Sequence, residues 1–256
     1  MLDPIEAAAV AAQFGVADEQ VQQDHLISHL LAVIARDLRD RVVFFGGTAL
    51  ARTYLPAGRL SEDLDLLAVP ARREVAPELE RALAVGVRRE YGRLAWDSPL
   101  TAVAGSAPGV LRTTDGLAVR IQLLDPAGYP RWPTESRGLV QRYTDVPSAE
   151  LTVLTLPAFT AAKTAAWHDR GAARDLYDLW GIAGLGAIDA AAADLFVRLG
   201  PTGRPPAGWM FGRPPSLADW QAQLGGQTRI AVSATDALSV VREAWARAVT
   251  SAAGEG

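Results

Sequence analysis

Two aspartates, Asp63 and Asp65, are separated by a single residue. They open an apolar run that predicts a strand over residues 64–69. Because side chains alternate along a strand, both carboxylates point to one face while Leu64 and Leu66 point into the core. Two carboxylates held in this way can bind Mg²⁺, which takes its remaining ligands from nucleotide phosphates. Metal-dependent nucleotidyl transfer needs such a pair, together with a place for the triphosphate.

A glycine pair upstream supplies the second requirement of that chemistry. The apolar residues 42–45 predict a short strand, Gly46 and Gly47 a tight turn, and residues 48–54 a helix. Glycines let the backbone approach a triphosphate closely, and the N-terminus of a helix attracts anions. The hydroxyl of Thr48 adds a polar group at the same place.

A third group of candidate residues lies in the alanine-rich second half, which is predicted to be helical from residue 157 onward. The lone lysine of the sequence is Lys163, in a chain that otherwise uses arginine. A single lysine among arginines indicates that this position needs a compact ammonium group rather than a planar guanidinium. Lys163 and Arg170 are seven residues apart and share a helix face, where two cations would complement phosphate charge.

Composition limits the remaining possibilities. The chain has no cysteine, so a metal must be held by oxygen or imidazole ligands. A net charge of -4 gives no general attraction to nucleic acid, so a polynucleotide would need a local basic surface. No apolar run is long enough to span a membrane and no basic leader opens the sequence. We therefore expect a cytoplasmic protein without a membrane partner.

An amphipathic helix is predicted over residues 18–39, with Asp18 as its N-cap. His25 and His29 lie one turn apart on this helix, a spacing that is compatible with metal binding. No acidic third ligand lies in register on the helix. The sequence therefore favours packing or surface roles for both histidines.

Taken together, the motifs resemble the DNA polymerase β-like nucleotidyltransferases and, among them, the AbiEii/AbiGii toxin family, with the MenT-like toxins as close relatives. Three segments carry the resemblance: Gly46-Gly47-Thr48-Ala49-Leu50, Arg59-x-Ser61-x-Asp63-x-Asp65 and Lys163…Arg170…Arg174-Asp175-x-x-Asp178. The resemblance implies an α+β fold. We expect a nucleotidyltransferase lobe with a mixed sheet at residues 1–148 and a mainly helical lobe, which carries Lys163 and the Arg-Asp-x-x-Asp motif, at residues 149–256.

The resemblance also implies roles for individual residues. Asp63 and Asp65 match the metal carboxylates, and Lys163 matches the triphosphate lysine. The expected nucleotide-binding set is Gly46, Gly47, Thr48, Arg59, Ser61, Lys163 and Arg170. Asp175 matches a further acidic residue of the catalytic set, and the sequence leaves open whether it orients Lys163 or Arg170 or contacts the metal.

One position departs from the superfamily pattern. Polymerase β-like enzymes commonly carry a third carboxylate on a later strand, and the predicted hairpin at residues 110–124 offers Gln122 there. An amide is neither an anionic ligand nor a good general base. Either Asp175 or Asp125 supplies the base, or positioning and metal electrostatics suffice.

What the resemblance implies is a toxin of a type IV-like toxin–antitoxin system that uses NTP and Mg²⁺ (or Mn²⁺). Its acceptor would be an RNA such as the tRNA 3′ end, its action would block translation or growth, and a cognate antitoxin would be its protein partner. Two alternatives stay open. The net acidity favours a small-molecule, antibiotic-type nucleotidyltransferase, and Gln122 motivates a catalytically degenerate nucleotide-binding protein.

Overall fold

The computed structural model describes residues 2–254 and divides into two compact units. The first unit contains the chain up to Tyr129 together with Thr134–Leu154, and the second contains Pro130–Pro133 and the chain from Thr155 onward. The predicted α+β fold is confirmed. The first unit extends past the expected limit at residue 148, because a strand at Glu150–Leu154 belongs to its sheet. Within the described residues, no helix has both the length and the apolar character needed to cross a membrane.

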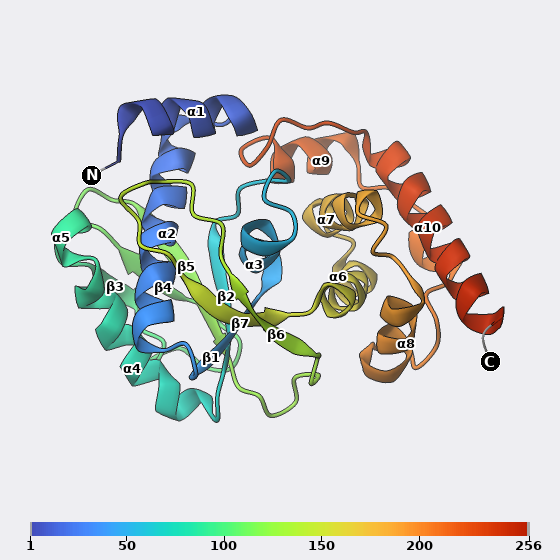
Figure 1. The fold of residues 1–256 in the computed structure, drawn as a ribbon, viewed down its shortest axis with the longest axis horizontal. Helices are drawn as coiled ribbons and strands as arrows, with labels where there is room; N and C mark the ends of the chain where they lie inside the picture. The colour runs from blue at the N-terminus through green and yellow to red at the C-terminus, as the bar shows by residue number, and fades with distance from the viewer. Residues whose placement is uncertain (1, 255–256) are drawn as a thin grey trace. The chain divides into compact units, whose positions relative to one another are not determined.

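A mixed sheet, seven-stranded within residues 2–254, forms the centre of the first unit (Figure 1). Its strand order is β3-β4-β5-β2-β1-β7-β6. The strands are β1 (Val42–Phe45), β2 (Asp63–Ala68), β3 (Ala95–Ser98), β4 (Gly109–Arg112), β5 (Ala118–Leu124), β6 (Thr134–Gly138) and β7 (Glu150–Leu154). The strand that carries the two aspartates, β2, is the central one. It pairs antiparallel with β1 and parallel with β5, so both of its edges are fixed by backbone hydrogen bonds.

The helices of the first unit are α1 (Pro4–Phe14), α2 (Asp18–Asp37), α3 (Gly46–Thr53), α4 (Arg72–Gly86) and α5 (Arg88–Tyr91). The two long helices α2 and α4 pack on each other, and α4 also packs on β2, β3 and β5. The predicted N-cap of α2 is wrong. The cap is Ala17, and Asp18 is instead the first helical residue, where its carboxylate still interacts favourably with the helix dipole.

The sequence also predicts a strand near residues 139–143, and this prediction is wrong. This segment follows β6 without joining the sheet, and its backbone bonds to a helix instead: the Val140 amide donates to the carbonyl of Arg52 in α3. Its apolar side chains Leu139 and Tyr143 are buried. The expected hairpin at residues 110–124 is confirmed, because β4 and β5 pair antiparallel.

The second unit is helical. Its elements are α6 (Leu156–Arg170), α7 (Ala173–Gly184), α8 (Ala190–Leu199), the 3-10 helix η1 (Gly208–Phe211), α9 (Leu217–Leu224) and α10 (Ala234–Gly254). Helix α6 packs on α7 and α8, and α10 packs on α7, α8 and η1. Large apolar side chains fill the interior, among them Phe196, Phe211, Trp220 and Trp245. Burial of Phe211 anchors the proline-rich segment around η1.

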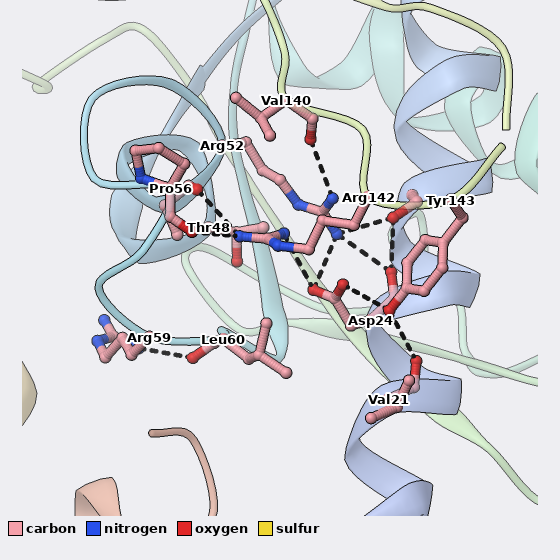
Figure 2. Close-up of polar contacts among 12 residues, drawn as sticks. Val21, Asp24, Thr48, Arg52, Pro56, Arg59, Leu60, Val140, Arg142 and Tyr143 are labelled. Atoms are coloured by element: carbon pink, nitrogen blue, oxygen red, sulfur yellow. Dashed lines mark hydrogen bonds and ion pairs between the residues drawn. The ribbon is translucent and has the colours of Figure 1, made fainter. Parts of the chain in front are cut away.

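A buried ionic network in the first unit fixes α3 against α2 (Figure 2). The Arg52 guanidinium of α3 donates at 2.8 Å to both Asp24 Oδ1 and Ser28 Oγ of α2. Tyr143 donates to the second carboxylate oxygen of Asp24 at 2.9 Å, and Arg142 lies 3.5 Å from the first. Burial, and then repulsion by Arg52, lower the pKa of Arg142 to about 10, so it stays charged at neutral pH. The network thus ties together α2, α3 and the segment after β6.

Arg52→Met is expected to lower the free energy of unfolding by about 3–5 kcal/mol, because it leaves the Asp24 carboxylate buried without its main partner. Urea-induced unfolding measures this loss. The matched control is Arg36→Met, which breaks an exposed pair with Asp37 and should cost less than about 1 kcal/mol. Equal, small losses in the two variants would contradict the assigned role of the network.

Candidate active site

Gly46 and Asp65 make the closest approach in the predicted site. Antiparallel pairing places Phe45 of β1 opposite Asp65 of β2, so the next residue, Gly46, lies against the carboxylate. A Cβ atom on Gly46 would be 2.0 Å from Asp65 Oδ2, and the glycine has a φ of +77°. Both the space and the backbone conformation therefore require glycine. Helix α3 begins at Gly46 itself, without the intervening turn that the sequence predicted.

Gly47 faces two further predicted residues. A Cβ atom there would lie 2.6 Å from Arg59 Nη2 and 3.1 Å from Ser61 Oγ, and both of these side chains are buried. The loop between α3 and β2 thus brings a guanidinium and a hydroxyl to the first turn of the helix. In the first unit, the structure brings together the predicted residues Gly46, Gly47, Arg59, Ser61, Asp63 and Asp65.

Thr48 is buried, and its hydroxyl donates to the backbone carbonyl of Asp63. This contact joins the first turn of α3 to the start of β2. The hydroxyl proton is therefore already used within the protein. The geometry supports a positioning role for Thr48 rather than the direct nucleotide contact that the sequence analysis expected.

The donor set of β2 fits a hard divalent cation. Buried and partly exposed positions alternate along the strand, with Leu64 and Leu66 fully buried and Asp63 and Asp65 partly exposed on the other face, as predicted. Oxygen ligands from two carboxylates with room for water and phosphate are what Mg²⁺ prefers. Asp63 and Asp65 would hold the metal, and Arg120 of β5 lies 3.9 Å from Asp63 Oδ1.

The predicted placement of Gln122 beside the carboxylate pair is confirmed by the register of β5. Gln122 is the partner of Asp65 on this strand, and its amide nitrogen donates to the carbonyl of Ser106 at 2.6 Å. Asp125 follows the end of β5 and accepts backbone hydrogen bonds from Ala127 and Arg72, which lower its pKa. A carboxylate with a lowered pKa is a weak base.

Sequence reasoning missed Arg120 and Tyr129 as neighbours of the carboxylates. The ring of Tyr129 packs on Phe45 with 5.2 Å between centroids, and burial together with the charge of Asp65 raises the pKa of its hydroxyl. The signal for Arg120 was present, since it lies two residues before Gln122 on the same strand face. Tyr129 lies in a turn-rich segment, where no periodicity could place it.

The second unit gathers the other predicted residues into a buried ionic cluster. Lys163 Nζ lies 2.6 Å from Asp178 Oδ2 and 3.2 Å from Asp175 Oδ1. Arg170 reaches the same Asp175 with two nitrogens, at 2.7 and 3.0 Å. Lys163 and Arg170 therefore do share a face of α6, and they meet the acidic residues of α7. Sequence reasoning left Asp178 out of the site, although its spacing from Asp175 places both on one face of that helix.

The charges of this cluster determine whether the Asp175 carboxyl group is ionised. Burial favours the neutral acid, but the charge of Lys163 and the hydrogen bond from Arg170 outweigh it and lower the pKa of Asp175 to about 2. The carboxylate is therefore ionised at neutral pH and paired with the side chains of Lys163 and Arg170. This environment suits a residue that orients Lys163 and Arg170, and it makes Asp175 a poor general base.

Gly46→Ala is expected to weaken Mg²⁺-dependent binding of non-hydrolysable NTP analogues by at least ~10-fold, since the added methyl group displaces Asp65 and strains the backbone. Isothermal titration calorimetry measures the affinity. The control is Gly138→Ala in β6, where a Cβ atom meets nothing within 4 Å and affinity should stay within about twofold. Unchanged affinity in the Gly46 variant would contradict this geometry.

Lys163→Met is expected to cost the second unit about 3–5 kcal/mol of unfolding free energy, because Asp175 and Asp178 then stay buried without the ammonium. Adding Asp178→Asn to this variant should restore part of the loss, since it removes one uncompensated charge. Urea unfolding of the four proteins of this cycle gives the coupling. Strictly additive losses would show that the two side chains do not interact.

Comparisons with known proteins agree with this architecture. The family model described as "Nucleotidyl transferase AbiEii toxin, Type IV TA system" matches residues 29–249. Among solved structures, the MenT4 nucleotidyltransferase toxin from Mycobacterium tuberculosis is 25% identical, with a TM-score of 0.73 over 95% of this chain and 89% of that one. No curated protein matches the chain.

A structure of a putative nucleotidyltransferase from H. pylori shares the fold at 14% identity, with a TM-score of 0.58 over 94% of this chain and 99% of that one. The family match covers most of the sequence, including both the β2 carboxylates and the cluster around Lys163. The chain is a nucleotidyltransferase that belongs to the AbiEii family of type IV toxin–antitoxin systems.

Proposed function

We propose that this nucleotidyltransferase toxin transfers nucleotides from an NTP, with Mg²⁺, onto an RNA acceptor, and that the acceptor is the 3′ end of tRNA. The observation that carries the proposal is the placement of Asp63 and Asp65 on one face of the central strand, directly beside the N-terminus of α3. Such a pair can hold Mg²⁺, which when bound neutralises phosphate charge and binds the oxygens of the transferred group.

The residues around Gly47 bind and orient the triphosphate in this proposal. The first turn of α3 offers backbone N–H groups, which bind anions. Arg59 and Ser61 bring a cation and a hydroxyl to the same turn. Thr48 and the β1–β2 pairing hold the turn against the carboxylates, so substrate and metal ligands keep a fixed geometry.

The family resemblance implies that Lys163 and Arg170 bind phosphate groups, and we propose this role for both residues. The side chain of Arg170 is 60% exposed, so its guanidinium is accessible to a ligand, whereas Lys163 is buried and held by two carboxylates. Asp175 is then a positioning residue. Of the three candidates Gln122, Asp125 and Asp175, none is a strong general base. We therefore propose that substrate positioning and electrostatic stabilisation supply most of the rate enhancement, as they do in phosphoryl transfer generally.

An RNA acceptor fits a surface of the second unit. Trp209 in η1 is 67% exposed, and Arg204 and Arg213, which precede and follow it in the sequence, are exposed as well. Exposed aromatic rings and arginines are typical of surfaces on which unpaired bases stack, as at a single-stranded 3′ end. A cognate antitoxin, which the family implies, is the expected protein partner.

The test incubates the protein with tRNA and each labelled NTP in turn, with Mg²⁺. Label should enter the tRNA, and Asp65→Asn should lower the rate at least ~1,000-fold because it removes a metal ligand. The matched control Asp40→Asn changes an exposed carboxylate and should leave the rate unchanged. Label in a small molecule would select an antibiotic-type enzyme, and nucleotide binding without transfer would select a degenerate one.

The same assay tests the acceptor surface. Trp209→Ala should weaken transfer to tRNA by roughly 5- to 150-fold, which corresponds to the loss of one base stack, without changing NTP affinity. Leu217→Ala, at another exposed apolar residue of the second unit, is the control. Equal tRNA kinetics in the two variants would remove Trp209 from the acceptor site and leave the reaction itself in place.

A further inference from the structure

A cluster of three potential metal ligands lies in the first unit, apart from the residues assigned above to nucleotide binding. His25 and His29 occupy successive turns of α2, so their rings lie on one face of the helix. Asp145, from the segment between β6 and β7, meets both rings: its Oδ1 is 3.0 Å from His25 Nε2 and its Oδ2 is 3.7 Å from His29 Nε2. The sequence offered no acidic group in register on α2, and the acidic side chain beside the two histidines is not on that helix. The ligand comes from a distant part of the chain.

The geometry of the cluster is close to that of a coordination sphere. The three ligand atoms all lie within 4.8 Å of one another. Ligands at about 2.0–2.1 Å from a tetrahedral metal are about 3.4 Å apart, and the two distances to Asp145 bracket this value. Small side-chain rotations would be enough to close the sphere around an ion.

The second observation is an unsatisfied nitrogen. His29 is only 4% exposed, and in the part of the chain that the structure describes its Nε2 atom has no hydrogen-bond partner. The nearest acidic oxygen, on Asp145, is beyond hydrogen-bonding distance. A buried polar atom without a partner costs about 1–3 kcal/mol, and a ligand to a metal would recover that cost.

The orientation of His25 agrees with metal binding. Its Nδ1 atom is hydrogen-bonded to the hydroxyl of Tyr91 from α5. If Nδ1 carries the proton, Nε2 presents its lone pair toward Asp145. Metal-binding histidines commonly hold their second nitrogen in this way, which fixes both the ring and its tautomer.

We propose that His25, His29 and Asp145 form a Zn²⁺ site. Two imidazole nitrogens and one carboxylate favour zinc over magnesium, whose ligands are oxygens. The Asp145 side chain is 27% exposed, so the ion has a path from solvent and can keep water as a remaining ligand.

The proposed site connects α2 to the segment after β6, which the buried ionic network also joins. Asp24, next to His25, accepts a hydrogen bond from Tyr143, two residues before Asp145. A bound ion would strengthen this connection between α2 and the segment after β6. Because the same network holds Arg52 of α3, zinc would stabilise the support of the nucleotide-binding helix without contacting the nucleotide.

The test uses the full chain, stripped of metal with a chelator and titrated with Zn²⁺ alone by calorimetry, without NTP. The wild type should bind one equivalent and show a higher melting temperature, and Co²⁺ in place of Zn²⁺ should give the visible absorption of nitrogen and oxygen ligation. His29→Gln and Asp145→Asn should each weaken binding at least ~10-fold, as loss of a ligand requires. A wild-type chain without saturable Zn²⁺ binding overturns the proposal, whether or not the variants fold.

Two controls separate this site from others. His168→Gln removes the remaining histidine of the sequence, and Asp63→Asn with Asp65→Asn removes the carboxylates of β2. Both proteins should bind Zn²⁺ like the wild type. Loss of zinc binding in either control, or full binding in His29→Gln, would place the ion elsewhere. Neither result bears on nucleotidyl transfer, which the tRNA assay tests separately.

Discussion

The contact between Gly46 and Asp65 is the constraint on which the active centre depends. Strand pairing brings the end of β1 opposite Asp65 of β2, and only a residue without a side chain fits at Gly46, against the carboxylate. The N-terminus of α3 and the metal-binding face of β2 are therefore one rigid element. The hydrogen bond from Thr48 to the Asp63 carbonyl makes a second connection within the same turn. Rigid placement of this kind is what phosphoryl transfer requires of a protein.

Buried charge supports this element and the cluster of the second unit in similar ways. Asp24 of α2 forms an ion pair with Arg52 of α3. Asp175 and Asp178 of α7 form ion pairs with Lys163 of α6. In each case the charges are paired inside the protein, so removing one partner is far more costly than removing an exposed pair. Single-residue substitutions at these positions therefore perturb stability as well as chemistry. The effect of Lys163 substitutions on activity has to be separated from this loss of stability.

Local patterns in the sequence predicted the strand, the glycine pair, the helix and the shared face of Asp63 and Asp65, because each depends on neighbours a few residues away. The alternation along the second hairpin strand also predicted that Gln122 lies on its polar face, and the pairing of β2 with β5 places it beside Asp65. Long-range partners could not be predicted. Asp145 is 120 residues from His25, and it lies in a segment without regular structure.

Other differences have the same physical origin. The segment at residues 139–143 has the apolar residues of a strand, but it bonds to α3 rather than to the sheet. The Thr48 hydroxyl is of a type that can bind a nucleotide, but in the folded protein it donates to the backbone of β2. Asp175 has the carboxylate of a base, and its two cations hold its pKa too low for that role. Sequence identifies the chemical groups, whereas their partners decide what each group can do.

A crystal structure with Mn²⁺ and a non-hydrolysable NTP tests the proposed metal and nucleotide site most directly, because anomalous scattering locates the metal. We expect an anomalous peak bound by the carboxylates of Asp63 and Asp65, with the triphosphate against the first turn of α3. A nucleotide bound elsewhere, or a nucleotide-bound metal without a ligand from either aspartate, would contradict the central claim.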